Sequence, residues 1–350
     1  MKLEERQFIS LDLGTSNVLA YVSKKGVVYN EPSIMAYDNL TNTLIALGYD
    51  AYEMVGKTNE NTRMVVPIKD GIIADMEAAK DLLKNIFNKL KMMDIWKGSV
   101  VLLACPSGVT ELERDALKLV AMDLGAEMVV VEEEVKLAAI GAGININLPK
   151  GNVVIDIGGG TTDVAILASG EVVASKSIKI AGTSFDEDIK KYIRSEYNVN
   201  IGSKSAENVK IQLGSLGKYN AERSMSVYGR DIVSGLPKEA LVSAEEIRNV
   251  LINSFSKITD LFIELLETTP PELAGDIIKN GIILCGGGSM IRNVEKYFSD
   301  IFSIPCKVAK DPLLAVINGS KELEKQIFTK IENGFYGKNG QKLKQINKFM

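Results

Sequence analysis

The sequence predicts an α/β protein in which one type of domain occurs twice. Near the N-terminus an apolar, strand-like run ends on Asp12, turns through the glycine-led, hydroxyl-rich segment 14–17 and resumes as a second apolar run. The same order of features returns 144 positions later, where a β-branched run ends on Asp156, turns through 158–162 and resumes at 164–167. A strand, a turn and a strand that recur in this way indicate two hairpins from a duplicated domain.

Each turn has the composition of a phosphate-binding loop. Gly158, Gly159 and Gly160 stand in a row before two threonines, whereas a structural hairpin needs only one or two turn glycines. Glycines leave backbone N–H groups unshielded, and a row of such donors can hold phosphate oxygens. Asp12 and Asp156 end the preceding strands, where a carboxylate can hold Mg²⁺ through the water shell of the ion. We therefore predict a nucleotide between the two halves, with its phosphates held from both sides.

Composition bounds the class of protein. The 350 residues suffice for two domains, and the 46% hydrophobic and 25% charged content is that of an ordinary soluble protein. A formal net charge of −4 argues against a nucleic-acid partner, which would select a basic surface. The lack of histidine excludes histidine acid–base catalysis and histidine metal sites. Cys105, Cys285 and Cys306 have no metal-binding spacing, and without a signal-peptide pattern or a membrane-spanning run they predict a reducing cytoplasm.

The first half of the chain reads as alternating strands and helices. After the first hairpin, strand-like runs are expected at 26–29 and 33–37, and the polar stretch 38–65 suits a small subdomain. The next expected elements are a helix with an apolar stripe at 76–92, a strand at 100–104, a helix at 111–124, a strand at 128–131 and a helix from Glu132–Glu134 to about 140.

The second half begins with the second hairpin and a mixed region at 184–241. Helices are expected there at 185–197 and 205–213. Ser243 and Glu246 form a capping box for a helix that runs through Leu266. A small-residue helix is expected at 313–319, after Asp311 and Pro312.

A third glycine-rich segment follows the strand-like run 282–284. The run leads directly into Cys285, three glycines, Ser289 and Met290. Glycines in this position let the backbone approach a flat ligand closely, which suits an adenine or a ribose. Alone the triplet equally fits a plain turn, and the two phosphate hairpins upstream favour the ligand.

Three segments together resemble the nucleotide-binding motifs of a known superfamily. DLGTSN at 12–17 and DIGGGTTD at 156–163 look like the two phosphate motifs of the actin/Hsp70/sugar-kinase superfamily, and CGGGSMIR at 285–292 looks like its adenosine motif. The sequence between these motifs is similar to that of the bacterial actin family MreB, and the similarity covers roughly residues 8–325. The segments concerned are NEPS at 30–33, CPSGVTELERDA at 105–116, IGAG at 140–143, GRDIVSGLPK at 229–238 and DPLLAVINGS at 311–320.

The resemblance implies an actin-like fold, with two duplicated ribonuclease-H-like domains around a nucleotide cleft and a small subdomain inserted in each. Residues 1–32, 66–142 and 311–335 would form subdomain IA, 33–65 IB, 143–183 and 242–310 IIA, 184–241 IIB, and 336–350 a flexible basic tail. It also implies Mg–ATP binding and self-assembly into paired protofilaments on the inner face of the cell membrane. The expected role is cell shape, or motility in a wall-less cell, with shape or motility proteins as partners.

The resemblance also assigns roles residue by residue. Asp12 and Asp156 would be the Mg²⁺-side carboxylates. A slow ATP hydrolysis would rely on Glu134, counted back from IGAG, and on Thr161, which together would orient the attacking water. The residues expected to bind ATP or ADP are Gly14, Thr15, Ser16, Asn17, Gly158, Gly159, Gly160, Thr161, Gly182, Glu207, Lys210, Gly287, Gly288 and Met290.

Glu134 stands where the chain departs from the family pattern. The family usually follows this glutamate with proline and a small apolar residue, whereas Val135 and Lys136 follow it here. A lysine two positions away would change the charge around the carboxylate, and the hydrolysis rate is the property that this affects. Without the resemblance, Glu134 reads more readily as a first-turn carboxylate that complements the helix dipole.

A separate expectation concerns the membrane. The segment 92–98 holds the only tryptophan of the chain at what should be a loop. The resemblance implies that Ile95 and Trp96 of this loop enter lipid. Nearby lysines that would suit anionic lipid are Lys84, Lys89, Lys91 and Lys97. The tail 336–350 adds four lysines and no acidic residue, which favours an anionic surface as well. The alternatives are that Trp96 packs under the sheet and that the tail only aids solubility.

Other members of the superfamily remain as alternatives. A small-molecule kinase needs a substrate pocket, and no insertion between the hairpins reads as one. A chaperone-type ATPase needs a further domain after the helix near 311–320, where only about 25 residues follow. A plasmid-segregating actin relative is the nearest alternative, and lipid binding would separate it from the leading reading.

Overall fold

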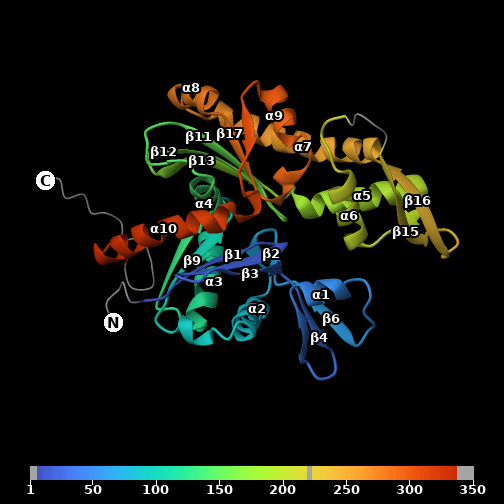
Figure 1. The fold of residues 1–350 in the computed structure, drawn as a ribbon, viewed down its shortest axis with the longest axis horizontal. Coiled ribbons are helices and arrows are strands. Elements are labelled where there is room, and N and C mark those ends of the chain that lie inside the picture. The colour runs from blue at the N-terminus through green and yellow to red at the C-terminus, as the bar shows by residue number, and fades with distance from the viewer. Residues whose placement is uncertain (1–5, 219–222, 337–350) are drawn as a thin grey trace. The chain divides into compact units, whose positions relative to one another are not determined.

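The structure of the chain, a computed structural model, describes residues 6–218 and 223–336 (Figure 1). The chain divides into two units. Unit 1 comprises Met1–Met54, Thr58–Ile144 and Leu314–Met350, and unit 2 comprises Val55–Lys57 and Asn145–Leu313. The basic tail, apart from Tyr336, lies outside the described residues. The four-subdomain division stays a prediction.

Unit 1 is built on a five-stranded sheet. Its strands are β1 Phe8–Leu13, β2 Asn17–Val22, β3 Gly26–Pro32, β9 Val100–Cys105 and β10 Met128–Glu133, in the spatial order β10-β9-β1-β2-β3. The first hairpin forms its centre, because β1 pairs antiparallel with β2 and parallel with β9. β9 is buried along its whole length, as expected for a continuous apolar run in a parallel arrangement.

Unit 2 repeats this sheet. Its strands are β11 Asn152–Ile157, β12 Thr162–Ala168, β13 Glu171–Ile178, β17 Ile282–Cys285 and β18 Cys306–Val308, in the order β18-β17-β11-β12-β13. The second hairpin again lies at the centre, with β11 antiparallel to β12 and parallel to β17. Read from the parallel edge, the two sheets have the same strand order and the same strand directions. The predicted duplication is therefore confirmed.

Each unit also carries a separate three-stranded sheet. In chain order it is inserted after the first three strands of the main sheet and before the other two. The strands are β4 Met35–Asp38, β5 Leu44–Leu47 and β6 Thr62–Val65 in unit 1, and β14 Val199–Asn200, β15 Ser224–Asp231 and β16 Pro237–Ser243 in unit 2. A short hairpin of β7 Ile68–Lys69 and β8 Ile72–Ile73 follows the first of them. β4 begins two residues after the predicted start at Ser33, because the Ser33 N–H and hydroxyl are bonded to the first turn instead.

The helices lie largely where the sequence predicts them. In unit 1 they are α1 Tyr49–Met54, α2 Met76–Lys89, α3 Glu111–Asp123, α4 Glu134–Gly141 and α10 Ala315–Glu332. In unit 2 they are α5 Gly182–Tyr197, α6 Ser203–Leu213, α7 Ala244–Glu267, α8 Pro271–Asn280 and α9 Val294–Phe302. The capping box of α7 is confirmed, since the Glu246 N–H donates to Ser243 Oγ at 3.3 Å and the Ser243 N–H donates to Glu246 Oε2 at 2.7 Å.

The last helix differs most from the prediction. A helix is expected at 313–319, but α10 continues to Glu332 and crosses α4 (Figure 1). Gly319 does not end it; a Cβ on Gly319 would overlap the Leu137 carbonyl oxygen, and a Cβ on Gly141 would overlap that of Ala315. The glycines are therefore needed for a close helix crossing, and neither tolerates a side chain.

α10 also packs on the first hairpin. The Phe328 ring lies 6.0 Å from the Phe8 ring of β1. At the end of the hairpin the Ser23 hydroxyl donates to Glu324 Oε1 at 2.6 Å. The central strands of unit 1 are thus covered by a helix from the far end of the chain.

Candidate functional site

The turn of the first hairpin is fixed by contacts within unit 1. A Cβ on Gly14 would lie 2.8 Å from the Asn17 carbonyl oxygen, so glycine is required there. The Gly14 carbonyl accepts a hydrogen bond from the Ser33 hydroxyl at 2.6 Å, and the Ser16 carbonyl accepts one from the Ser33 N–H at 2.9 Å. In a trans peptide the N–H points opposite to the preceding carbonyl, so the Thr15 N–H is directed away from Ser33. Ser33 thus orients a backbone donor of the turn.

Two side chains of the same turn already make hydrogen bonds within unit 1. The Thr15 hydroxyl accepts from the Gly71 N–H at 2.9 Å, which leaves its own proton for a ligand. Asn17 Nδ2 donates to Asn30 Oδ1 at 3.1 Å. Ser16 is exposed. Ser33 and Gly71 are supporting residues that the sequence reasoning missed, since nothing local marks them as neighbours of this turn.

Asp12 lies at the end of β1, opposite Leu19 of β2. Burial raises the pKa of its carboxyl to about 7. A nearby cation would favour the ionised form and offset this desolvation. Among the described residues no group of three or more Asp, Glu, Cys or His side chains is placed to hold a metal. A carboxylate such as that of Asp12 suits Mg²⁺, because this ion typically uses one or two carboxylates, with water and phosphate oxygens as its other ligands.

The turn of the second hairpin presents two aligned donors. The Gly158 carbonyl accepts from the Gly182 N–H at 3.1 Å, and the Gly159 carbonyl accepts from the Thr183 N–H at 2.8 Å. Because each peptide N–H opposes its carbonyl, the N–H groups of Gly159 and Gly160 point away from α5, side by side. Two neighbouring N–H groups directed away from the helix are suited to bind an anion. The Gly158 N–H is used within the turn, where it donates to the Thr161 carbonyl at 2.9 Å.

Asp156 is held at the end of β11 by the third glycine-rich segment. It is 6% exposed and lies beside Cys285 in the parallel register. A Cβ on Gly286, whose φ is +77°, would overlap Asp156 Oδ1, and a Cβ on Gly288 would overlap the Ile157 side chain. Two of the three glycines are therefore explained by packing against β11. Gly287 and Met290, in the short helix Gly287–Met290, are exposed and remain candidates for a ligand contact.

The two proposed catalytic residues come from different units. Glu134 is the first residue of α4 and is half-buried, and Thr161 ends the glycine turn with 8% of its surface exposed. Lys136 does not point to solvent; its Nζ lies 3.4 Å from Glu132 Oε2, with the two side chains 5% and 11% exposed. The Lys136 charge, which departs from the family pattern, is thus paired with a carboxylate at the end of β10, inside unit 1.

The remaining predicted ligand residues gather at the start of α5. Lys210 of α6 donates from Nζ to the Gly182 carbonyl at 3.0 Å and to Asp186 Oδ2 at 2.9 Å. Glu207 stands one turn before Lys210 on the same helix and is half-buried. Burial raises the pKa of Asp186 to about 6, against the lowering effect of the Lys210 ammonium. The sequence reasoning missed Asp186, because an aspartate within a polar helix carries no local signal.

The expectation that Trp96 enters lipid is wrong. Trp96 is 0% exposed and belongs to the one-turn helix Met93–Trp96, with its ring 5.0 Å from the Phe87 ring of α2. A single large aromatic ring is stabilised far more by burial in the core of unit 1 than by display on a loop. Ile95 is half-buried, and its contact with lipid stays a prediction. No helix in the described part of the chain is both long and apolar enough to cross a bilayer.

Comparison with known proteins places this geometry in a family. The model of the MreB/Mbl protein family matches residues 6–332. The chain is 41% identical over 312 residues to the cell shape-determining protein Mbl of Bacillus subtilis (strain 168), covering 89% of this chain and 94% of that protein.

Two crystal structures resemble the fold closely. That of MreB 5 of Spiroplasma citri bound to AMPPNP has a TM-score of 0.92 and 69% identity, covering 94% of this chain and 99% of that one. That of the same protein bound to ADP has a TM-score of 0.91 and 68% identity, covering 95% and 100%. The actin-like fold predicted from the sequence is confirmed. Since family model, relative and structures each match nearly the whole length, the chain belongs to the MreB/Mbl protein family.

Proposed function

We propose that the chain is an ATP-binding bacterial actin that forms filaments on the inner face of the cell membrane and determines cell shape, or drives motility in a wall-less cell. The observation that carries the proposal is the pair of hairpin turns. In each, an aspartate is the last residue but one of the strand before the turn. The backbone of each turn is fixed by hydrogen bonds from neighbouring segments. The binding of AMPPNP and ADP by the similar MreB 5 supports a nucleotide in this role. The description of Mbl as cell shape-determining supports the cellular role.

Mg-dependent hydrolysis would use groups on both turns. Bound Mg²⁺ supplies charge neutralisation of the phosphates. Asp12 and Asp156 would hold the ion through its water shell, and the N–H groups of Gly159 and Gly160 would bind phosphate oxygens. Glu134 and Thr161 would orient the attacking water. Phosphoryl transfer depends mostly on positioning and charge stabilisation, so these groups suffice for a slow ATPase.

The membrane contact in this proposal rests on charge. Lys84, Lys91 and Lys97 are exposed around the end of α2 and the segment after it, whereas Lys89 is 3.2 Å from Glu31. Basic residues near an anionic leaflet contribute about 1 kcal/mol each. Anionic lipid and further copies of the chain are therefore the proposed partners.

Pelleting with liposomes tests the proposal as a whole. The full chain is mixed with vesicles of phosphatidylglycerol or of phosphatidylcholine, with and without Mg–ATP, and the pellets are viewed by electron microscopy. We expect filaments on the anionic vesicles in the presence of Mg–ATP. A chain that binds ATP but stays monomeric and unpelleted under every condition would contradict the filament and membrane roles, and leave nucleotide binding standing.

Removing Asp156 should weaken nucleotide binding through the metal. Asp156→Ala is expected to reduce Mg–ATP affinity by about 10- to 100-fold, as for other groups that hold a metal through its outer shell. Calorimetry with and without EDTA checks this, because the parent and the variant should become similar once Mg²⁺ is removed. Asp276→Ala is the matched control, since Asp276 is a unit 2 carboxylate that accepts from the Gly151 N–H. Equal Mg–ATP affinity of Asp156→Ala and parent would rule out the metal role.

A further inference from the structure

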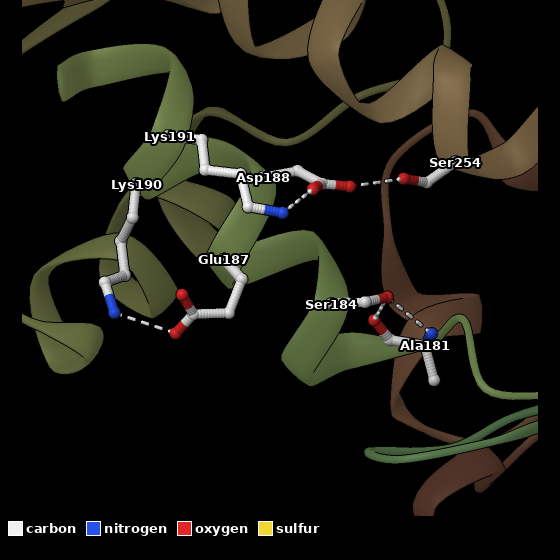
Figure 2. Close-up of polar contacts among 7 residues, drawn as sticks. All are labelled: Ala181, Ser184, Glu187, Asp188, Lys190, Lys191 and Ser254. Atoms are coloured by element: carbon white, nitrogen blue, oxygen red, sulfur yellow. Dashed lines mark hydrogen bonds and ion pairs between the residues drawn. The ribbon is translucent and has the colours of Figure 1, made fainter. Parts of the chain in front are cut away.

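The helix α5 begins on the phosphate turn rather than on a side-chain cap. The first N–H groups of a helix have no partner within the helix, and a serine or aspartate side chain usually accepts from them. Here Gly182 and Thr183 donate instead to the carbonyls of Gly158 and Gly159. Figure 2 shows that the nearest candidate cap, Ser184, is turned back on Ala181, donating to its carbonyl at 2.8 Å and accepting from its N–H at 2.9 Å. The turn that would bind phosphate is therefore the cap of α5.

The same first turn of α5 holds α6. Lys210 Nζ donates to the Gly182 carbonyl and lies 2.9 Å from both carboxylate oxygens of Asp186. The Lys210 and Asp186 side chains are each 15% exposed, so the pair is largely shielded from water. An ammonium has three N–H donors, and at least two are used here within the protein. Lys210 thus keeps at most one N–H for a ligand, and within the protein it links two helices.

These contacts form one continuous chain within unit 2. The glycine turn caps α5, the start of α5 accepts from Lys210, and Lys210 fixes the face of α6 that also carries Glu207. Asp186 is the residue that holds Lys210 in this place. It lies one helical turn from Gly182 and does not belong to either glycine-rich segment.

We propose that Asp186 is a positioning residue for nucleotide binding, which holds Lys210, and with it α6, in register with the phosphate turn. This inference rests on the proposed function, in which the turn binds phosphates and α6 contacts the adenosine. A ligand that spans both parts gains from their fixed relative position, whereas a fragment that occupies one part does not. Loss of Asp186 should therefore affect the whole nucleotide and spare its fragments.

The test compares Mg–ATP with magnesium pyrophosphate and adenosine as separate ligands. Asp186→Asn keeps the size of the side chain and removes its charge, and it is expected to reduce Mg–ATP affinity about tenfold, as a small misplacement of a bound ligand does. The affinities for pyrophosphate and for adenosine should stay within about twofold. In ATP hydrolysis KM should rise with the dissociation constant while kcat stays within about twofold, because Glu134 and Thr161 are untouched.

Three further variants make the test independent of folding. Lys210→Gln should give the same loss, and the double variant should bind Mg–ATP no more weakly than either single one, since both remove one link. Glu187→Gln is the control; Glu187 is exposed on the same helix and pairs with Lys190 at 2.7 Å (Figure 2). Thermal unfolding of every variant shows that it is folded.

The outcomes separate the inference from the function on which it rests. A folded Asp186→Asn with parental Mg–ATP affinity overturns the inference and leaves nucleotide binding intact. Equal losses for Mg–ATP, pyrophosphate and adenosine overturn it too, because they indicate a general disturbance. A parent chain that binds no Mg–ATP overturns the proposed function, and the inference with it.

Discussion

Trp96→Ala should destabilise the chain by about 3–5 kcal/mol, the usual cost of removing a large aromatic side chain from a core. The Trp96 ring is wholly buried and meets Phe87 edge-on, with 5.0 Å between the ring centroids. Alanine would leave a cavity that the surrounding sheet and helix fill only in part. Denaturant unfolding followed by circular dichroism measures the change. This outcome is opposite to that of a lipid-inserted tryptophan, whose replacement would cost little stability.

Two other variants sharpen this test. Trp96→Phe keeps the ring contact with Phe87 and removes an indole N–H that has no acceptor within the described structure, so it should cost clearly less than the alanine. Ile95→Thr changes the half-buried neighbour and tests the remaining lipid expectation by liposome pelleting. If Trp96→Ala unfolded at the parental denaturant concentration but no longer pelleted with anionic liposomes, the core assignment would be untenable.

Glu134→Gln is expected to lower kcat for ATP hydrolysis by about 100-fold or more, because a general base or water-orienting carboxylate contributes about 10²–10⁴-fold. The amide keeps the shape of the side chain but loses the charge that orients the water. Nucleotide affinity should stay within about threefold, since phosphate binding relies on backbone N–H groups. Phosphate release under saturating Mg–ATP gives kcat, and calorimetry gives the affinity.

A matched control lies next in the chain. Glu133 precedes α4 as its N-cap and has a carboxylate oxygen 3.9 Å from Arg114, so Glu133→Gln changes the same charge without a role in hydrolysis. A helix-dipole role for Glu134 predicts a different result, namely a stability loss of about 0.3–1 kcal/mol with unchanged kcat. An unchanged kcat would therefore return Glu134 to that structural reading.

The central architecture follows from local sequence signals. Asp12 and Asp156 each end an apolar run before a glycine-led turn, and both hairpins occupy the centre of a five-stranded sheet. Ser243 and Glu246 mark the start of α7 correctly, because a capping box involves only residues three apart. Patterns of this kind involve only residues that are close together in the sequence, so they can be recognised without knowledge of the fold.

What the sequence could not supply depends on contacts between distant residues. Gly319 looks like the end of a helix until α4 is placed against it, and Gly286 looks like a ligand-facing glycine until Asp156 is placed beneath it. Trp96 looks like a loop residue because the ring of Phe87 that receives it lies outside the segment. The link of Asp186 to Lys210 joins two helices, and no spacing rule predicts it.

The late position of α10 has a consequence for how the chain is made. A ribosome releases the sheet of unit 1 and α4 first, then the whole of Asn145–Leu313, and only afterwards the helix that covers β1 and β2. Unit 2 is almost entirely one continuous stretch, so it can complete its core during synthesis. Unit 1 has to wait for α10, and until that helix is made Phe8 lacks the Phe328 ring and Gly141 of α4 lacks the helix that packs against it. The nascent first half therefore keeps apolar surface open that α10 covers in the folded unit.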